Sequence, residues 1–289
     1  MGLPTADDRP VSRPEQGVDV SAWNAMTYDG KDTILRVVRH EAEQFLDLVD
    51  RADAWEAPTG AGHWQVRDVV GHLVDTTESY FVAFDAARGH GTADPAYGLP
   101  GMAARVDERA QSFRDQPRTA LVERLRGDFD KMMQTFDAFT EDDWTNLLVP
   151  HFYMGPLPAF FFPAFQLMDY GVHSWDIRQG TGRAHGLSGE AADLLTPFMF
   201  VLWQYTVGGE KQPCELGIRI TSGPNAGDTR VTVGPDGTDY QPGDVSGVPT
   251  VIEFDPGSFV LTAFGRSNAG TIRGDRSVAD RYLNLFFRI

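Results

Sequence analysis

The spacing of apolar residues changes at Gly208 and Gly209, and this change limits the possible folds most strongly. Before this pair, apolar side chains recur every three or four residues, as in helices that bury one face. After it, short runs rich in β-branched residues alternate with turn sequences such as residues 224–227 and 235–237. A chain of 289 residues is long enough for two domains. We therefore expect a helical domain followed by a smaller domain of strands and helices.

The helical part is expected to contain long helices joined by moderate loops, which is the pattern of a helix bundle. Apolar residues at helical spacing predict helices over residues 31–52, 66–87, 102–113, 119–139, 157–179 and 189–207. Glycine-containing stretches at 89–91 and 180–182 are typical helix ends. Residues 140–156, which include His151 and Tyr153, read as an irregular connection.

The part after Gly209 is expected to be a small α+β domain. Strands are predicted at residues 216–221, 229–233, 248–254 and 269–273, and helices at residues 255–264 and 277–287. The predicted fold class is thus α plus α+β. The predicted divisions are an N-terminal tail over residues 1–28, a helical bundle over 29–207 and an α+β domain over 208–289.

Composition excludes several classes of protein. The formal net charge of −16 repels phosphate backbones, so nucleic acid is not an expected partner. One cysteine, Cys214, excludes a disulfide framework and a multi-cysteine zinc site. No apolar run of about 18 residues is present, so no membrane helix is expected. Residues 1–20 lack the apolar centre of a signal peptide, which predicts a cytoplasmic location. The sequence does not specify an oligomeric state.

Three residues form a candidate metal site. Asp169 and His173 are four positions apart on one predicted helix, so their side chains share a face. His72 lies one position before the core residue Leu73 on another helix and can also face inward. Two imidazoles and a carboxylate with an open position are typical of catalytic zinc, although nickel, iron and manganese also fit this ligand set. Alternatively, Asp169 bonds to His173 within the helix and His72 is a core residue.

Two segments carry a resemblance to a known family. They are WQVRDVVGHL at residues 64–73 and DYGVHSWDIR at residues 169–178. The chain resembles the DinB-like superfamily, and most of all its mycothiol-dependent maleylpyruvate isomerase branch. The resemblance implies a four-helix bundle in which a histidine and an acid-x3-histidine pair bind zinc, here His72, Asp169 and His173. Residues 255–258, 264–266 and 272–276 are similar to the sterol-carrier-like domain of those enzymes.

The chain departs from this branch at Asp169, where the branch usually has glutamate. The shorter side chain leaves the identity and affinity of the metal open. The resemblance also implies that an arginine of the C-terminal domain reaches the active site, without showing which one. We assign Arg266 and Arg276 to catalysis and Arg273 to cofactor binding.

Other candidate site residues lie on the connection and on the predicted metal helix. Because pocket residues often lie on loops, Tyr153 is a candidate proton donor and His151 a candidate cofactor-binding residue, with plain packing as the alternative for Tyr153. Asp176 is expected either to hydrogen-bond a ligand histidine or to pair with an arginine.

These observations predict a metal-dependent enzyme, with zinc the expected metal. It would activate mycothiol for S-transfer to a small electrophilic metabolite or for its isomerisation. One alternative is a thiol-independent metal enzyme that acts on a biosynthetic small molecule. Another is a non-catalytic protein that binds a small molecule.

Overall fold

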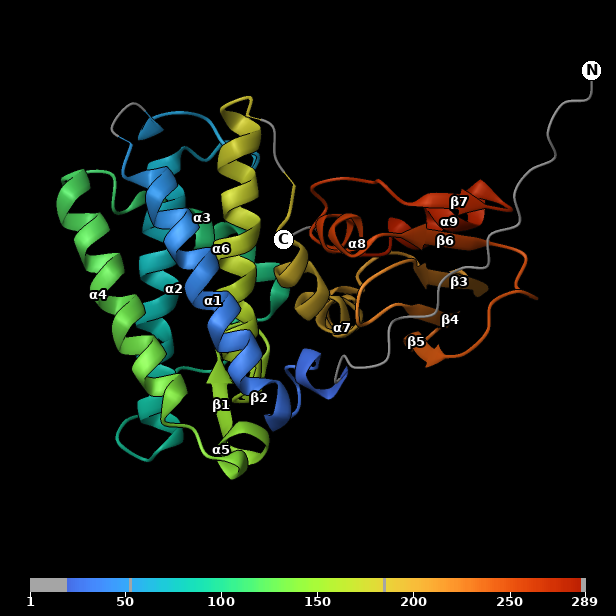
Figure 1. The fold of residues 1–289 in the computed structure, drawn as a ribbon, viewed down its shortest axis with the longest axis horizontal. Helices are drawn as coiled ribbons and strands as arrows, with labels where there is room; N and C mark the ends of the chain where they lie inside the picture. The colour runs from blue at the N-terminus through green and yellow to red at the C-terminus, as the bar shows by residue number, and fades with distance from the viewer. Residues whose placement is uncertain (1–19, 52–53, 184–185, 287–289) are drawn as a thin grey trace, which may run out of the picture.

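The computed structural model describes residues 20–51, 54–183 and 186–286. It has a helical domain and a sheet-containing domain, which lie beside each other in Figure 1. The expected fold class is therefore confirmed. The helices that the sequence predicted begin and end within a few residues of their expected positions.

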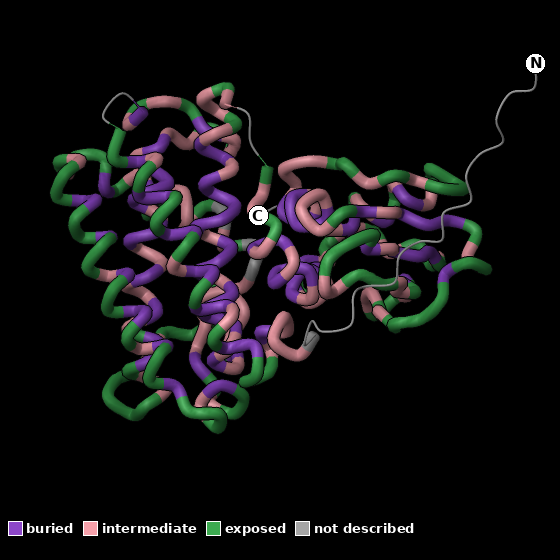
Figure 2. The backbone as a smooth tube through the Cα atoms, in the orientation of Figure 1, coloured by how far each residue is buried: buried purple, intermediate pink, exposed green. Residues whose placement is uncertain are grey.

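Four long helices form the body of the helical domain (Figure 1). Their apolar side chains meet in a common core that Figure 2 shows as buried. Three of the helices have a stripe of apolar residues at helical spacing, and the fourth, α6, is buried almost all round. These helices are α1 (Lys31–Val49), α2 (Val66–Ala87), α4 (Arg118–Asp137) and α6 (Phe161–Gly180). The shorter α3 (Leu99–Gln111) packs against α2, and two 3₁₀ turns, η1 (Val20–Trp23) and η2 (Tyr28–Gly30), precede α1.

The connection between α4 and α6 is ordered, although the sequence predicted it to be irregular. It contains α5 (Glu141–Asn146) and an antiparallel hairpin of β1 (Leu148–His151) and β2 (Gly155–Pro158). Thr140 and Asp143 cap the start of α5 reciprocally. These elements have only six, four and four residues, which is too short for a periodic pattern to reveal them.

The C-terminal domain contains a five-stranded sheet with the order β5-β4-β3-β6-β7. Strands β3 and β6 are parallel and the other pairs are antiparallel. The strands are β3 (Cys214–Ile220), β4 (Gly227–Gly234), β5 (Gly237–Pro242), β6 (Val251–Phe254) and β7 (Thr271–Arg273), and the helices are α8 (Pro256–Ala263) and α9 (Arg276–Leu283). The sequence did not predict β5, because this edge strand has no buried side chain and so lacks an apolar alternation.

Helix α7 (Gly189–Thr206) contacts both domains. Phe198 packs on Phe161 of α6 with ring centroids 5.7 Å apart. Trp203 packs on Phe259 of α8 and Tyr282 of α9, at 5.0 and 5.4 Å. Figure 1 shows α7 between the bundle and the sheet. The domain boundary predicted at residues 207 and 208 stays a prediction, since this helix packs on both sides of it.

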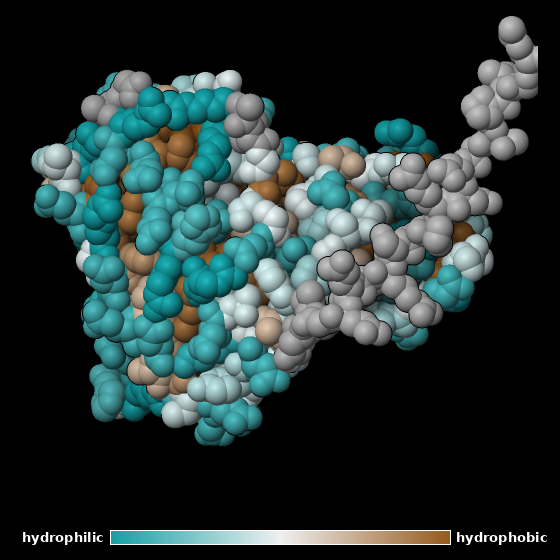
Figure 3. Space-filling model, in the orientation of Figure 1, coloured by the Kyte–Doolittle hydropathy of each residue, from teal (hydrophilic) through white to brown (hydrophobic). Residues whose placement is uncertain are grey.

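The visible face of the helical domain carries mostly hydrophilic side chains (Figure 3). Apolar side chains show between them mainly in the furrows that separate the helices. None of the helices in the described residues is long and apolar enough to cross a membrane.

Candidate metal centre and its cavity

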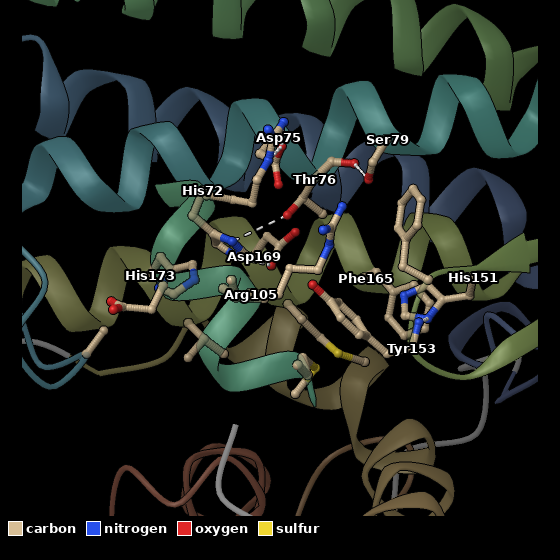
Figure 4. Close-up of a pocket in the computed structure, with 18 of the residues that line it drawn as sticks. His72, Asp75, Thr76, Ser79, Arg105, His151, Tyr153, Phe165, Asp169 and His173 are labelled. Carbon is tan, nitrogen blue, oxygen red and sulfur yellow. Dashed lines mark hydrogen bonds and ion pairs between the residues drawn. The ribbon is translucent and has the colours of Figure 1, made fainter. Parts of the chain in front are cut away.

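His72, Asp169 and His173 lie together where α2 faces α6. One ligand atom from each lies within 4.8 Å of the other two. His72 Nε2 is 3.6 Å from Asp169 Oδ1, and the two imidazole rings are 5.2 Å apart. Figure 4 shows the three side chains converging from the two helices. The structure thus brings the predicted ligands together, as a metal site requires.

The surroundings of Asp169 fit a bound cation. Its Oδ2 atom is buried and has no hydrogen-bond partner among the described residues. A buried carboxylate oxygen without a partner is costly unless a cation or a proton satisfies it. Among the described residues no hydrogen bond joins Asp169 to His173, whereas His173 contacts Asp176 through Nδ1 at 2.9 Å.

Asp176 orients His173 and also binds Arg266 of the C-terminal domain. Arg266 donates from Nε and Nη2 to the two carboxylate oxygens, at 3.0 and 3.1 Å. Burial acts to raise the pKa of Asp176, but the bonds from His173 and Arg266 outweigh it and keep the pKa below its usual value. An ionised Asp176 accepts a hydrogen bond from His173 Nδ1–H, which leaves His173 Nε2 available to bind a metal. The two roles considered for Asp176 therefore occur at once.

The indole of Trp64 covers the two histidines. Its ring lies 5.2 Å from His72 and 6.1 Å from His173, and its Nε1–H donates to Asp107 at 2.8 Å. Asp107 also contacts His63 at 2.7 Å. This cover excludes water from one side of the candidate site, and α3 holds it in place through Asp107.

A cavity of about 700 Å³ opens beside the candidate metal site. His72, Asp169 and His173 line it together with polar residues of α2 and α3, such as Asp75 and Arg105. Figure 4 shows Arg105 and Tyr153 beside the cluster. Apolar side chains form much of the remaining wall, namely Phe165, Met168, Met154, Leu202 and Phe264. The cavity is large enough for a small thiol and a small substrate together.

The predicted residues of the connection also line this cavity. His151 ends β1 and Tyr153 follows it in the hairpin turn. Burial lowers the pKa of His151 to about 4, so the imidazole is neutral at neutral pH. Burial raises the pKa of Tyr153, so its phenol stays protonated. Their roles stay predictions.

The structure does not bring the three predicted arginines to one site. Arg266 lines the cavity, whereas the structure does not bring Arg273 and Arg276 to it. The Arg273 side chain is 67 % exposed and pairs with Glu253, and that of Arg276 is 77 % exposed and pairs with Asp280 one helical turn away. The reason is topological, since β7 is the edge strand of the sheet and α9 follows it directly. Their predicted catalytic and cofactor-binding roles lack a structural basis.

Sequence reasoning missed Arg105, Trp64 and Asp107 as cavity residues. Trp64 is the first residue of the segment 64–73 that was quoted for its resemblance, and this was the available signal. Asp107 and Arg105 had no such signal, because only the packing of α3 on α2 turns them toward the cavity. Asp75 lines the cavity but is already paired with Arg109 at 2.5 Å.

Comparison with known proteins gives a family and two similar structures. Residues 38–178 match the family model of the mycothiol maleylpyruvate isomerase N-terminal domain. A crystal structure of mycothiol-dependent maleylpyruvate isomerase superimposes with a TM-score of 0.57 at 13% identity, covering 84% of this chain and 92% of that chain. A mutant of that isomerase gives a TM-score of 0.56 at 12% identity, with the same coverage. No curated protein matches the sequence.

Proposed function

Since residues 38–178 match the family model of the mycothiol maleylpyruvate isomerase N-terminal domain, we propose that this protein is a metal-dependent enzyme that uses mycothiol to transform a small electrophile. The observation that carries the proposal is the convergence of His72, Asp169 and His173 at the wall of a cavity. Zinc is the metal that this ligand set favours, and a bound zinc ion would supply a Lewis acid that holds a thiol in its thiolate form at neutral pH.

Different residues of the chain would bind the metal and orient its ligands. His72 and His173 would hold the metal through nitrogen and Asp169 through oxygen. Asp176 and Arg266 fix the orientation of His173, as partners of ligand histidines commonly do. Aspartate at position 169 carries the same charge as glutamate but is one methylene shorter, so it would hold the ion nearer to the backbone of α6.

The cavity would bind the thiol and the electrophile side by side. Its apolar wall, which includes Phe165 and Met168, would exclude water and lower the local dielectric constant. Arg105 and Tyr153 offer hydrogen-bond donors at the cavity surface. We infer that the substrate has a carbon body for the apolar wall and oxygen atoms for these donors.

The test combines metal content with turnover. Purified protein should bind about one zinc ion per chain, and His72→Ala should abolish this binding, while the exposed His40→Ala on α1 should not. Two assays then follow, isomerisation of maleylpyruvate and thiol conjugation of 1-chloro-2,4-dinitrobenzene. Each is run with and without metal and with and without mycothiol.

The expected result is turnover in at least one assay that requires both metal and mycothiol. Turnover that requires metal but not mycothiol would instead support the thiol-independent enzyme. Sub-stoichiometric metal uptake together with no turnover would contradict the proposal and favour a non-catalytic binding protein.

A further inference from the structure

His151 is held in one tautomer by its own hairpin. Its Nδ1 atom lies 3.4 Å from the backbone nitrogen of Tyr153 and 3.3 Å from that of Met154. Both amides are donors, so Nδ1 must accept and cannot carry a proton. A neutral imidazole with an unprotonated Nδ1 carries its proton on Nε2. The chain thereby fixes His151 as an Nε2–H donor.

The surroundings of His151 keep the ring neutral. It packs on Phe165 with ring centroids 4.9 Å apart, on Tyr153 at 6.0 Å and on Tyr80 at 6.3 Å. The titratable groups that face it are these two phenols and Asp169 on α6. Burial outweighs the carboxylate of Asp169 and sets the pKa of His151 at about 4. The imidazole therefore does not gain a proton above about pH 5.

The proton on Nε2 has no acceptor within the described part of the chain. His151 lines the cavity, and the hydrogen bonds found for its ring all involve Nδ1. Arg105, which also lines the cavity, is a donor, and the carboxylate of Asp169 acts on the ring through its charge, with no hydrogen bond between the two among the described residues. A donor at the wall of a cavity that has no partner in the protein is available to an acceptor atom of a ligand.

We propose that His151 is a catalytic residue that donates its Nε2–H to a carbonyl oxygen of the substrate. The reaction considered is the isomerisation of maleylpyruvate, whose carbon–carbon double bond is conjugated to that carbonyl. This inference rests on the proposed function. A neutral imidazole suits this role because it stabilises negative charge on oxygen without first giving up its proton.

Addition and expulsion of the thiolate balance in electrons and need no further reactant. When a thiolate sulfur adds to the conjugated carbon, its electron pair forms the S–C bond. The π pair of the double bond moves toward the carbonyl carbon, and the carbonyl oxygen takes the negative charge. His151 Nε2–H would stabilise that oxygen while the new single bond rotates. Expulsion of the sulfur reverses each shift, so no proton or oxidant is consumed and the thiol is recovered.

The first experiment measures the tautomer directly. Full-length protein with ¹⁵N-labelled histidine is examined by NMR at pH 7, with His151→Phe used to assign the resonance. The proposal requires a protonated Nε2 and an unprotonated Nδ1, with and without zinc. A protonated Nδ1 or an imidazolium would overturn it. This result does not depend on turnover, so it can overturn the inference even if the proposed function fails.

The second experiment separates donation from packing. His151→Phe keeps an aromatic ring against Phe165 but removes the donor, whereas the amide nitrogen of His151→Gln replaces it. With maleylpyruvate, kcat should fall about 10²- to 10³-fold for His151→Phe. It should stay within about tenfold of the parent for His151→Gln. The matched control is His40→Phe on the exposed side of α1, which should change nothing.

Three further measurements distinguish a catalytic effect of the substitution from misfolding. Zinc affinity, KM for mycothiol and the unfolding temperature should each stay close to the parent values in His151→Phe. Equal loss of kcat in His151→Phe and His151→Gln would overturn the proposal, and so would an unchanged kcat in His151→Phe. A fall in kcat that tracks lost zinc or a lost fold would assign His151 a structural role and would equally reject it.

Discussion

Arg266 and Asp176 form a buried ion pair that joins the two domains at the candidate metal site. They lie 90 positions apart in the sequence, and the side chain of Asp176 is fully buried. The same carboxylate contacts Nδ1 of His173. The position of the C-terminal domain is thus linked through two side chains to a candidate metal ligand. The first two predictions test this link.

Asp176→Asn should weaken zinc binding about 10- to 100-fold, because a neutral amide holds the ligand histidine less firmly. A competition titration with a chromophoric zinc chelator measures the dissociation constant. Asp280→Asn is the control, since Asp280 pairs with the exposed Arg276. Equal affinities in the parent and Asp176→Asn would show that Asp176 does not support the site.

Arg266→Gln should lower the free energy of unfolding of the metal-free protein by about 3 kcal/mol, because it leaves a buried carboxylate without its bidentate partner. Urea denaturation followed by circular dichroism provides the measurement. Arg276→Gln removes an exposed pair and should cost less than about 1 kcal/mol. If both substitutions lower the free energy of unfolding equally, the pair of Arg266 and Asp176 stabilises the protein no more than the exposed pair does.

Substitutions at Asp169 should separate the effect of side-chain charge on zinc binding from the effect of side-chain length. Asp169→Asn should weaken zinc binding more than about 100-fold, since it removes the negative charge from the ligand set, whereas Asp169→Glu should retain one ion per chain. Isothermal titration at fixed pH measures both variants. Asp75→Asn is the matched control, because Asp75 lines the same cavity and is paired with Arg109. A similar loss in Asp75→Asn would place the metal elsewhere.

Asp128→Asn should stabilise the protein at pH 7. Burial, reinforced by the negative charge of Glu78, raises the pKa of Asp128 to about 6 from its ordinary value of 3.8. A carboxyl group with a raised folded-state pKa contributes stability below pH 4, and this contribution is lost as pH rises through 6. The variant should therefore gain about 1–3 kcal/mol at pH 7 over the parent and little at pH 3.5.

The free energy of unfolding as a function of pH measures this effect. Asp130→Asn, two residues further along α4 and exposed, should leave the curve unchanged. A parallel shift of the Asp128→Asn curve at all pH values would assign the gain to packing instead of titration.

The sequence predicted the long elements because each has a periodic apolar pattern. The helices now seen as α1, α2 and α4 bury one face, and that requirement is visible in the spacing of their residues, whereas α6 is apolar and buried almost all round. It also predicted His72, Asp169 and His173. Residues i and i+4 share a helix face, and both the position of His72 beside the core residue Leu73 and the family resemblance indicated the third ligand. Short elements such as α5, β1 and β2 escaped prediction, since four to six residues carry no period.

The tertiary structure alone decided how distant residues combine. No spacing connects Asp176 to Arg266, or Trp64 to Asp107, because these contacts depend on how whole helices and domains pack. The same packing placed Arg266 at the cavity and left Arg273 and Arg276 exposed, a choice that the sequence left open. Local pattern therefore determined the elements and the ligand types, whereas long-range packing determined which charges are buried together and which groups face the substrate.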